Sequence, residues 1–425
     1  MATPGAPDPN KRLGLAAQTL LACLRPVAGS DVAERAADLQ PQVWDEALAL
    51  ALRHGVAPLL HRALHSTGEL AALSDCLRAR LEQERRATAL DNLRHYGQFR
   101  RVARALGERG IPVIALKGLH LAELVYRDIS LRPMADLDIL VPRAQLEAAV
   151  STLHGLGYGF AEDLSGAAGA MLDIKCNIGF LHRELDVLLE VHWSLDEPPA
   201  RYTEVLEAIW RSAVPARLGD ADTLVMSPAF LLLHVCAHLA YNHTFAFSLH
   251  ALCDVAEIVR AYPAIDWNVV VDHGRRHGWT RGVGAALRLA REHLGAAVPD
   301  QVLAALGADA FDSNILAEAM EHLVACTDMP DELRTAPNLM AFAGKQGLVE
   351  KLAALWARIF VPRAELALIY GVPQSSARLA FYYPVRMRDL LRRYAASAWA
   401  LSVSDPELAA TAARHARLAK WINDA

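Results

Sequence analysis

The stretch LRPMADLDILV (residues 131–141) places two aspartates, Asp136 and Asp138, inside an otherwise apolar run. Side chains alternate between the two faces of a β-strand, so these carboxylates would point the same way with their Cα atoms about 7 Å apart. Leu137 and Ile139 would point the other way and pack on helices. The pattern predicts a strand with one packed face and one acidic face.

Two like charges this close are costly unless a cation joins them, and Mg²⁺ is commonly held by one or two carboxylates plus substrate phosphates. A third acid is expected from a hairpin, which the runs CNIGFLH (176–182) and ELDVLLEVHW (184–193) predict. Glu190 is our candidate, and Asp186 and His192 share its face. Asp186 lies nearer the turn and is the weaker choice. The alternative is that all these acids are simply solvated at strand ends.

Upstream, the run IALKG (114–118) predicts a short strand that closes at Lys117-Gly118 before a helix. Such a turn offers backbone N–H groups and the positive end of a helix to a phosphate. Gly118 would let the backbone approach the phosphate closely, and Lys117 could neutralise its charge. A lysine that merely closes a strand is the alternative.

Helical patterns surround this segment. The run at 77–110 is amphipathic with spacings of three and four residues, and helical patterns resume at Pro228. We expect an α+β, helix-rich fold with a small mixed-sheet core flanked by N-terminal and C-terminal helical regions. The expected divisions are a helical region at 1–105, the α/β core at 106–220, a helical domain at 221–345 and a helical tail at 346–425.

Composition limits the class of protein. The chain has 425 residues, 53% hydrophobic and 21% charged, with a net charge of −5 and a pI near 6.4. This balance argues against an extended nucleic-acid surface or an anionic-membrane surface. The six cysteines are scattered without a C-x-x-C pair, which favours a cytoplasmic protein. The basic-then-apolar start at 11–30 is interrupted and is not expected to be a secretory signal, and no membrane span is expected.

The motifs LKG (116–118), LAELVYRDISLRPMADLDILV (121–141) and LLEVHW (188–193) together resemble the uncharacterised nucleotidyltransferase group of the polymerase-β-type superfamily. The resemblance implies transfer of a nucleotidyl group from an NTP, ATP in the first instance, to an acceptor that is a small molecule, a peptide or a protein. It implies Mg²⁺ in a two-metal site, with Mn²⁺ as the alternative. A non-catalytic NTP- or peptide-binding module and a kinase-like transfer of the γ-phosphoryl group are the competing interpretations.

Site residues follow from the same resemblance. It implies metal ligation and catalysis by Asp136, Asp138 and Glu190, phosphate binding by Lys117 and Gly118, and a phosphate or substrate contact by Arg132. Three departures are visible: Lys-Gly replaces the usual Gly-Ser, the gap of 18 from Gly118 to Asp136 is longer than usual, and the third acid is Glu rather than Asp. Arg132 could instead pair with Asp128 or Asp136.

Four further residues are candidates for lining the substrate: His192, His234, His238 and Asp254. The two middle histidines are spaced i, i+4 but lack the Glu of H-E-x-x-H, so a structural or substrate-lining role is favoured over metal binding. Asp254 resembles a position that the family keeps acidic. The tail arginines Arg386, Arg388, Arg392 and Arg393 could bind an acidic partner, although a solvated helix face explains them more simply.

Overall fold

The computed structural model describes residues 13–25, 40–161, 175–185, 187–197, 199–246, 249–325, 356, 359–370, 372, 375–390, 392 and 406–424. Asp186, Arg393 and the division expected at 345/346 lie outside these residues. The elements described below all lie within them.

A seven-stranded mixed sheet forms the α/β part of the protein, in the order β3-β4-β5-β2-β1-β7-β6. The pairs β5–β2 and β1–β7 are parallel and the other neighbours are antiparallel. This confirms the expected α+β fold with a mixed-sheet core. The strands are β1 (Ile114–Ala115), β2 (Leu137–Leu140), β3 (Tyr158–Phe160), β4 (Asn177–His182), β5 (Leu188–His192), β6 (Val214–Leu218) and β7 (Ala221–Val225).

The strand predicted from residues 136–141 and the predicted hairpin are both present, the latter as β4 and β5. Three strands were not predicted: β3, β6 and β7. The last two form a hairpin whose two turn residues, Gly219 and Asp220, both have positive φ (51° and 65°). Positive φ at both positions matches the right-handed twist of flanking strands, and Gly-Asp tolerates it. The sheet therefore extends to Val225.

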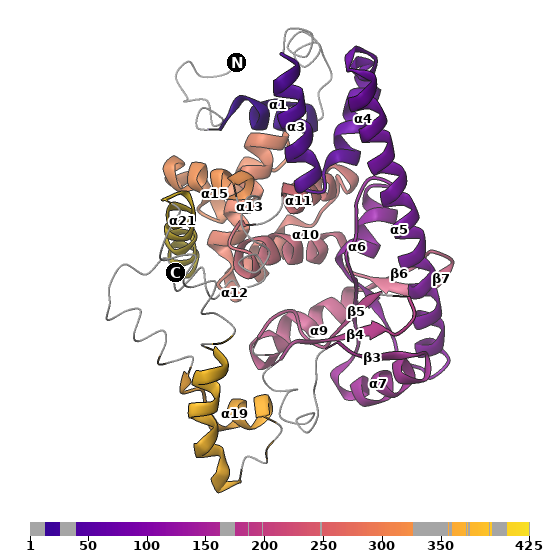
Figure 1. The fold of residues 1–425 in the computed structure, drawn as a ribbon, viewed down its shortest axis with the longest axis vertical. Helices are drawn as coiled ribbons and strands as arrows, with labels where there is room; N and C mark the ends of the chain where they lie inside the picture. The colour runs from indigo at the N-terminus through magenta and orange to yellow at the C-terminus, as the bar shows by residue number, and fades with distance from the viewer. Residues whose placement is uncertain are drawn as a thin grey trace.

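Helices surround the sheet (Figure 1). The longest, α5, has 33 residues, begins at the capping residue Ser74 and contacts both β7 and α7. The helices are α1 (Leu15–Leu24), α3 (Pro41–Arg53), α4 (Ala57–Thr67), α5 (Asp75–Gly107), α6 (Lys117–His120), α7 (Leu146–Gly155), α9 (Thr203–Ser212), α10 (Pro228–Ala237), α11 (Leu249–Ala261), α12 (Trp267–Arg276), α13 (Thr280–Leu294), α14 (Asp300–Ala305), α15 (Ser313–Ala325), α19 (Arg363–Tyr370) and α21 (Pro406–Asn423). Two π-helical turns, Leu121–Val125 and His238–Asn242, continue α6 and α10.

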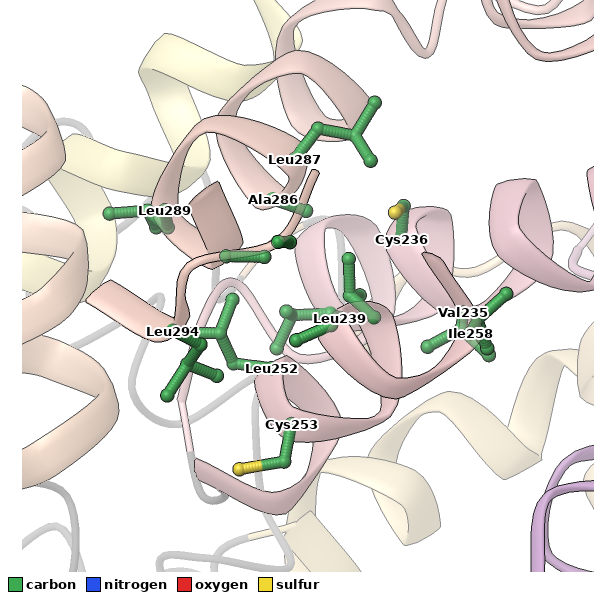
Figure 2. Packing of buried hydrophobic residues seen from close by; sticks show 14 of the residues in the cluster. Val235, Cys236, Leu239, Leu252, Cys253, Ile258, Ala286, Leu287, Leu289 and Leu294 are labelled. Atoms are coloured by element: carbon green, nitrogen blue, oxygen red, sulfur yellow. The ribbon is translucent and has the colours of Figure 1, made fainter. Parts of the chain in front are cut away.

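Two large clusters of buried apolar side chains hold these elements together. One packs the sheet against α5 and α7. The other joins α1, α3 and α4 to α10, α11 and α13, and Figure 2 shows part of it, with Leu239, Leu252 and Leu287 among the labelled side chains. Among the described residues, no helix is both long and apolar enough to cross a membrane.

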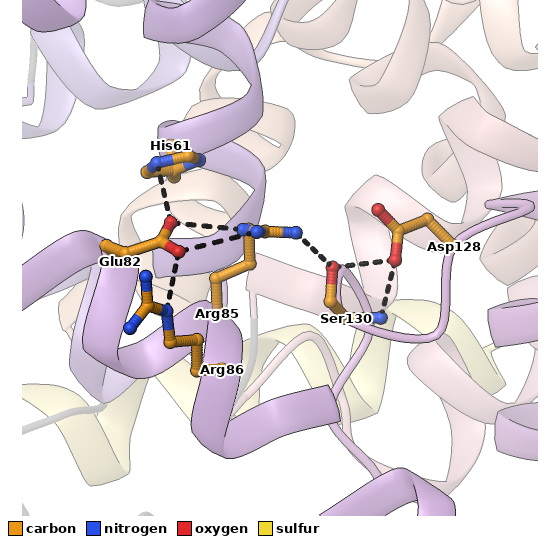
Figure 3. Close-up of polar contacts among 6 residues, drawn as sticks. All are labelled: His61, Glu82, Arg85, Arg86, Asp128 and Ser130. Carbon is orange, nitrogen blue, oxygen red and sulfur yellow. Dashed lines mark hydrogen bonds and ion pairs between the residues drawn. The ribbon is translucent and has the colours of Figure 1, made fainter. Parts of the chain in front are cut away.

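The loop that leads into β2 is held by polar contacts from α5. The Asp128 carboxylate accepts hydrogen bonds from the backbone and side chain of Ser130, whose hydroxyl also accepts one from Arg85 (3.2 Å), and Glu82 holds that arginine (Figure 3). Asn92, fully buried, donates to the carbonyls of residues 129 and 132 at 2.6 and 2.8 Å. These contacts fix the chain just before the two aspartates.

Candidate active site

The pairing of β2 with β5 brings the predicted acids together. The strands run parallel, and Asp138 lies directly opposite Glu190 in the register. His192, two residues beyond Glu190, places Nε2 2.8 Å from Asp138 Oδ1 and 3.4 Å from Glu190 Oε2. The amide of Asn177 on β4 donates to the same Glu190 oxygen at 2.7 Å. Ligand atoms of the two acids and the histidine all lie within 4.8 Å of one another.

Lys117 supplies a positive charge to this cluster from the end of β1. Its Nζ lies 3.5 Å from Asp138 Oδ2. The residue has a φ of 32°, a left-handed conformation that is uncommon outside glycine. Strained backbone of this kind concentrates at functional sites. The structure therefore places Lys117 beside the carboxylates that the sequence assigned to metal binding.

Gly118 contributes through close packing. A Cβ at this position would lie 2.8 Å from the side chain of Met134 and 3.2 Å from Nη1 of Arg132. No larger residue fits without moving these neighbours. The side chains of Met134 and Arg132, which pack against Gly118, therefore favour glycine at this position.

Asp136 lies beside the cluster and is partly buried. Burial, followed by the negative charge of Asp138, raises the pKa of Asp136 to about 6. For Asp138, burial opposes ionisation, but Lys117 and the hydrogen bond from His192 outweigh it and hold the pKa below its usual value. Burial likewise opposes the charge on His192, yet its bond to Asp138 prevails and raises its pKa to about 10.

These residues fit a divalent cation. Three carboxylates, Asp136, Asp138 and Glu190, act on one another here, and hard oxygen donors are what Mg²⁺ and Mn²⁺ bind. A cation at this position would offset both causes of the raised pKa of Asp136, which are its burial and the negative charge of Asp138. His192 positions Asp138 and Glu190 through its Nε2, which contacts an oxygen of each.

Arg132 pairs with Asp254 of α11, and not with either of the aspartates near it in sequence. Arg132 Nη2 lies 3.0 Å from Asp254 Oδ2, and the hydroxyl of Tyr126 donates to Asp254 Oδ1 at 2.8 Å. Asp254 is 2% exposed. Arg132, predicted to contact a phosphate or substrate, and Asp254, predicted to line the substrate, therefore form an ion pair with each other.

The two predicted histidines of α10 and its π-helical continuation, His234 and His238, lie close enough to Lys117 to feel its charge. The ring of His234 lies 6.0 Å from that of His238, which in turn lies 4.5 Å from that of His243. His234 is 6% exposed, and its Nε2 has no hydrogen-bond partner among the described residues. Burial, followed by the charge of Lys117, lowers the pKa of His234 to about 3, so its imidazole is neutral.

A cavity of about 220 Å³ lies beside Lys117. It is lined by Lys117, Arg132, His238, His243, His250 and Asp254, with Leu121, Val235, Leu239, Ala246 and Ala251. His243 and His250 were not predicted from the sequence. His250 stands four residues before Asp254 on α11, so the two share a helix face, and that spacing was an available signal.

In the C-terminal tail, Arg388 pairs with its neighbour Asp389.

A protein-family model matches most of the chain. The family model described as "Uncharacterised nucleotidyltransferase" matches residues 40–295, which contain every predicted site residue outside the tail. No curated protein matches the chain.

Proposed function

The chain belongs to the family of uncharacterised nucleotidyltransferases, and on that premise we propose that it moves a nucleoside monophosphate from an NTP to an acceptor hydroxyl and releases pyrophosphate. The observation that carries the proposal is the register of β2 and β5, which sets Asp138 opposite Glu190 with Lys117 at 3.5 Å. Carboxylates on adjacent strands can hold a divalent cation that also binds phosphate oxygens, and a lysine beside them can contact the same phosphates.

The acids have distinct roles in this proposal. Asp136, Asp138 and Glu190 would hold the divalent cations of a two-metal site, Mg²⁺ or alternatively Mn²⁺. Such cations would supply positive charge for the phosphates and would lower the pKa of the acceptor hydroxyl. The Glu190 side chain is 29% exposed, against 5% for Asp138. Glu190 is therefore more accessible to an acceptor than Asp138, and we assign it the role of taking the proton of the attacking hydroxyl.

The cavity beside Lys117 positions the substrates. Lys117 neutralises a phosphate oxygen of the NTP, for which ATP is our first choice. Arg132, fixed by Asp254, presents its guanidinium to the same cavity. His238 and its neighbours line the wall with imidazoles kept neutral by burial, which can donate or accept hydrogen bonds. The acceptor, whether a small molecule, a peptide or a protein, would enter on this side.

Labelled ATP tests the proposal directly. Protein, Mg²⁺ and a panel of hydroxyl acceptors are incubated in parallel with α-labelled or γ-labelled ATP. We expect transfer of the α-label only, and transfer of only the γ-label would replace the proposal with phosphoryl transfer. Asp138→Asn should abolish both the transfer and the Mg²⁺-dependent binding of ATP, whereas the exposed control Asp222→Asn on β7 should keep both. ATP binding without any transfer would favour the non-catalytic module.

A further inference from the structure

A second and larger cavity, of about 490 Å³, lies between α1, α4 and α11. Its wall also includes Val125, Tyr126 and Arg127, at the end of the π-helical turn. It shares no lining residue with the cavity beside Lys117. The proposed transfer reaction therefore does not account for it.

Arginines dominate the charge of this second cavity. Its lining contains Arg25, Arg62, Arg127 and Arg260, against a single acid, Glu257. Glu257 is buried and already pairs with two of them, with its Oε2 2.7 Å from Arg260 Nη1 and its Oε1 in contact with Arg62. The lining thus carries three more positive than negative charges.

The two remaining arginines stand at the exposed edge of the cavity. Arg25 follows the last turn of α1, and Arg127 has a φ of 57°, which is uncommon for a residue other than glycine. Glu69 acts electrostatically on Cys23 in the wall but does not itself line the cavity.

Apart from Ser66 and Thr67, the rest of the wall consists mainly of apolar side chains. Leu59, Val125 and Leu294 line it, and the ring of Tyr126 lies 6.0 Å beneath the Arg62 guanidinium. Guanidinium groups bind phosphate and carboxylate oxygens through paired N–H donors. Cavities of roughly 300–1,000 Å³ with apolar walls and a few polar groups are typical of small-molecule sites.

We propose that this cavity binds a small organic oxyanion, a phosphate monoester or a carboxylate carried on a compact apolar body. The arginines bind the charged group and the leucines and Tyr126 contact the body. Because the two cavities share no wall residue, this site stands whether or not the proposed transfer reaction is correct. Tyr126 is nonetheless near both, since its hydroxyl bonds to Asp254 in the other wall.

Calorimetric titration with three probes tests the site: phenyl phosphate, benzoate and benzyl alcohol. We expect at least one of the two anions to bind and the neutral alcohol not to bind, and comparing the anions identifies the preferred oxyanion. In the double variant Arg25→Gln/Arg127→Gln, affinity for the anion should fall at least tenfold. The matched control Arg100→Gln/Arg109→Gln removes two exposed arginines elsewhere and should bind like the unmodified protein.

A further variant separates the two cavities. Lys117→Met alters the cavity beside Lys117 and no lining residue of the arginine-lined cavity, so it should leave binding of the anion unchanged. Failure of both anions to bind the unmodified protein would overturn the proposal. So would equal binding by the Arg25/Arg127 double variant. If Lys117→Met lost binding of the anion while the Arg25/Arg127 double variant kept it, the anion would instead bind in the cavity beside Lys117. Circular dichroism of each variant confirms that the fold is kept.

Discussion

Replacing Asp254 by alanine should destabilise the protein more than most single substitutions. The carboxylate of this residue pairs with Arg132 and accepts the hydrogen bond of Tyr126, and all three side chains are largely buried. Removing one partner of a buried ion pair costs about 3–5 kcal/mol, because the other charge is left uncompensated. A buried hydroxyl without its acceptor adds about 1–3 kcal/mol. Since the two losses overlap, we expect a decrease of roughly 4–6 kcal/mol in the free energy of unfolding.

Urea unfolding followed by tryptophan fluorescence measures this decrease. Asp254→Asn should cost less than the alanine change, because the amide oxygen still accepts from Tyr126. The double change Arg132→Leu/Asp254→Leu should cost well below the sum of its single changes, since it leaves no buried charge unpaired. A loss below about 1 kcal/mol for Asp254→Ala, or strict additivity in the double variant, would refute the reasoning.

Three other expectations concern separate regions. Gly282→Ala should lower the free energy of unfolding by about 1–3 kcal/mol through overpacking, because the new Cβ would lie 2.6 Å from that of Ala240. Its control, Gly97→Ala, would meet no atom within 4 Å and should be neutral or stabilising in the same urea assay. Glu190→Gln should weaken Mn²⁺ binding, followed by electron paramagnetic resonance, at least about tenfold; unchanged affinity would contradict its role as a ligand. Burial lowers the pKa of His415 to about 4, so below pH 6.5 the unfolded state binds a proton that the folded state does not. Stability should therefore fall with pH between about 6.5 and 4, by up to about 1.4 kcal/mol per pH unit for this group, and urea midpoints for His415→Gln should show a shallower slope.

Local patterns in the sequence predicted the elements that carry the acids. The alternation around Asp136 and Asp138 identified β2, and the two runs near Glu190 identified the hairpin β4–β5. Both signals lie within a few consecutive residues. The Gly219-Asp220 turn was an equally local signal for β6 and β7, and it was missed.

Contacts between distant segments could not be predicted in the same way. The parallel register that sets Asp138 against Glu190 is a property of the folded sheet, because the segment between the strands does not specify it. The partner of Arg132 lies 122 residues away, while two aspartates close in sequence were the obvious candidates. The raised pKa of Asp136 likewise depends on burial and on charges from three different elements.

The pairing of Arg132 with Asp254 has a consequence for engineering this protein. The sheet with its carboxylates looks like a unit that could be excised or exchanged between relatives. Yet the arginine four residues before Asp136 is held by a carboxylate on α11, in the helical region that follows the sheet. A graft of the sheet alone would carry an unpaired guanidinium into its new host. Chimaeras should therefore transfer α11 together with β2. A crossover between the sheet and the helical region would separate Arg132 from its partner Asp254.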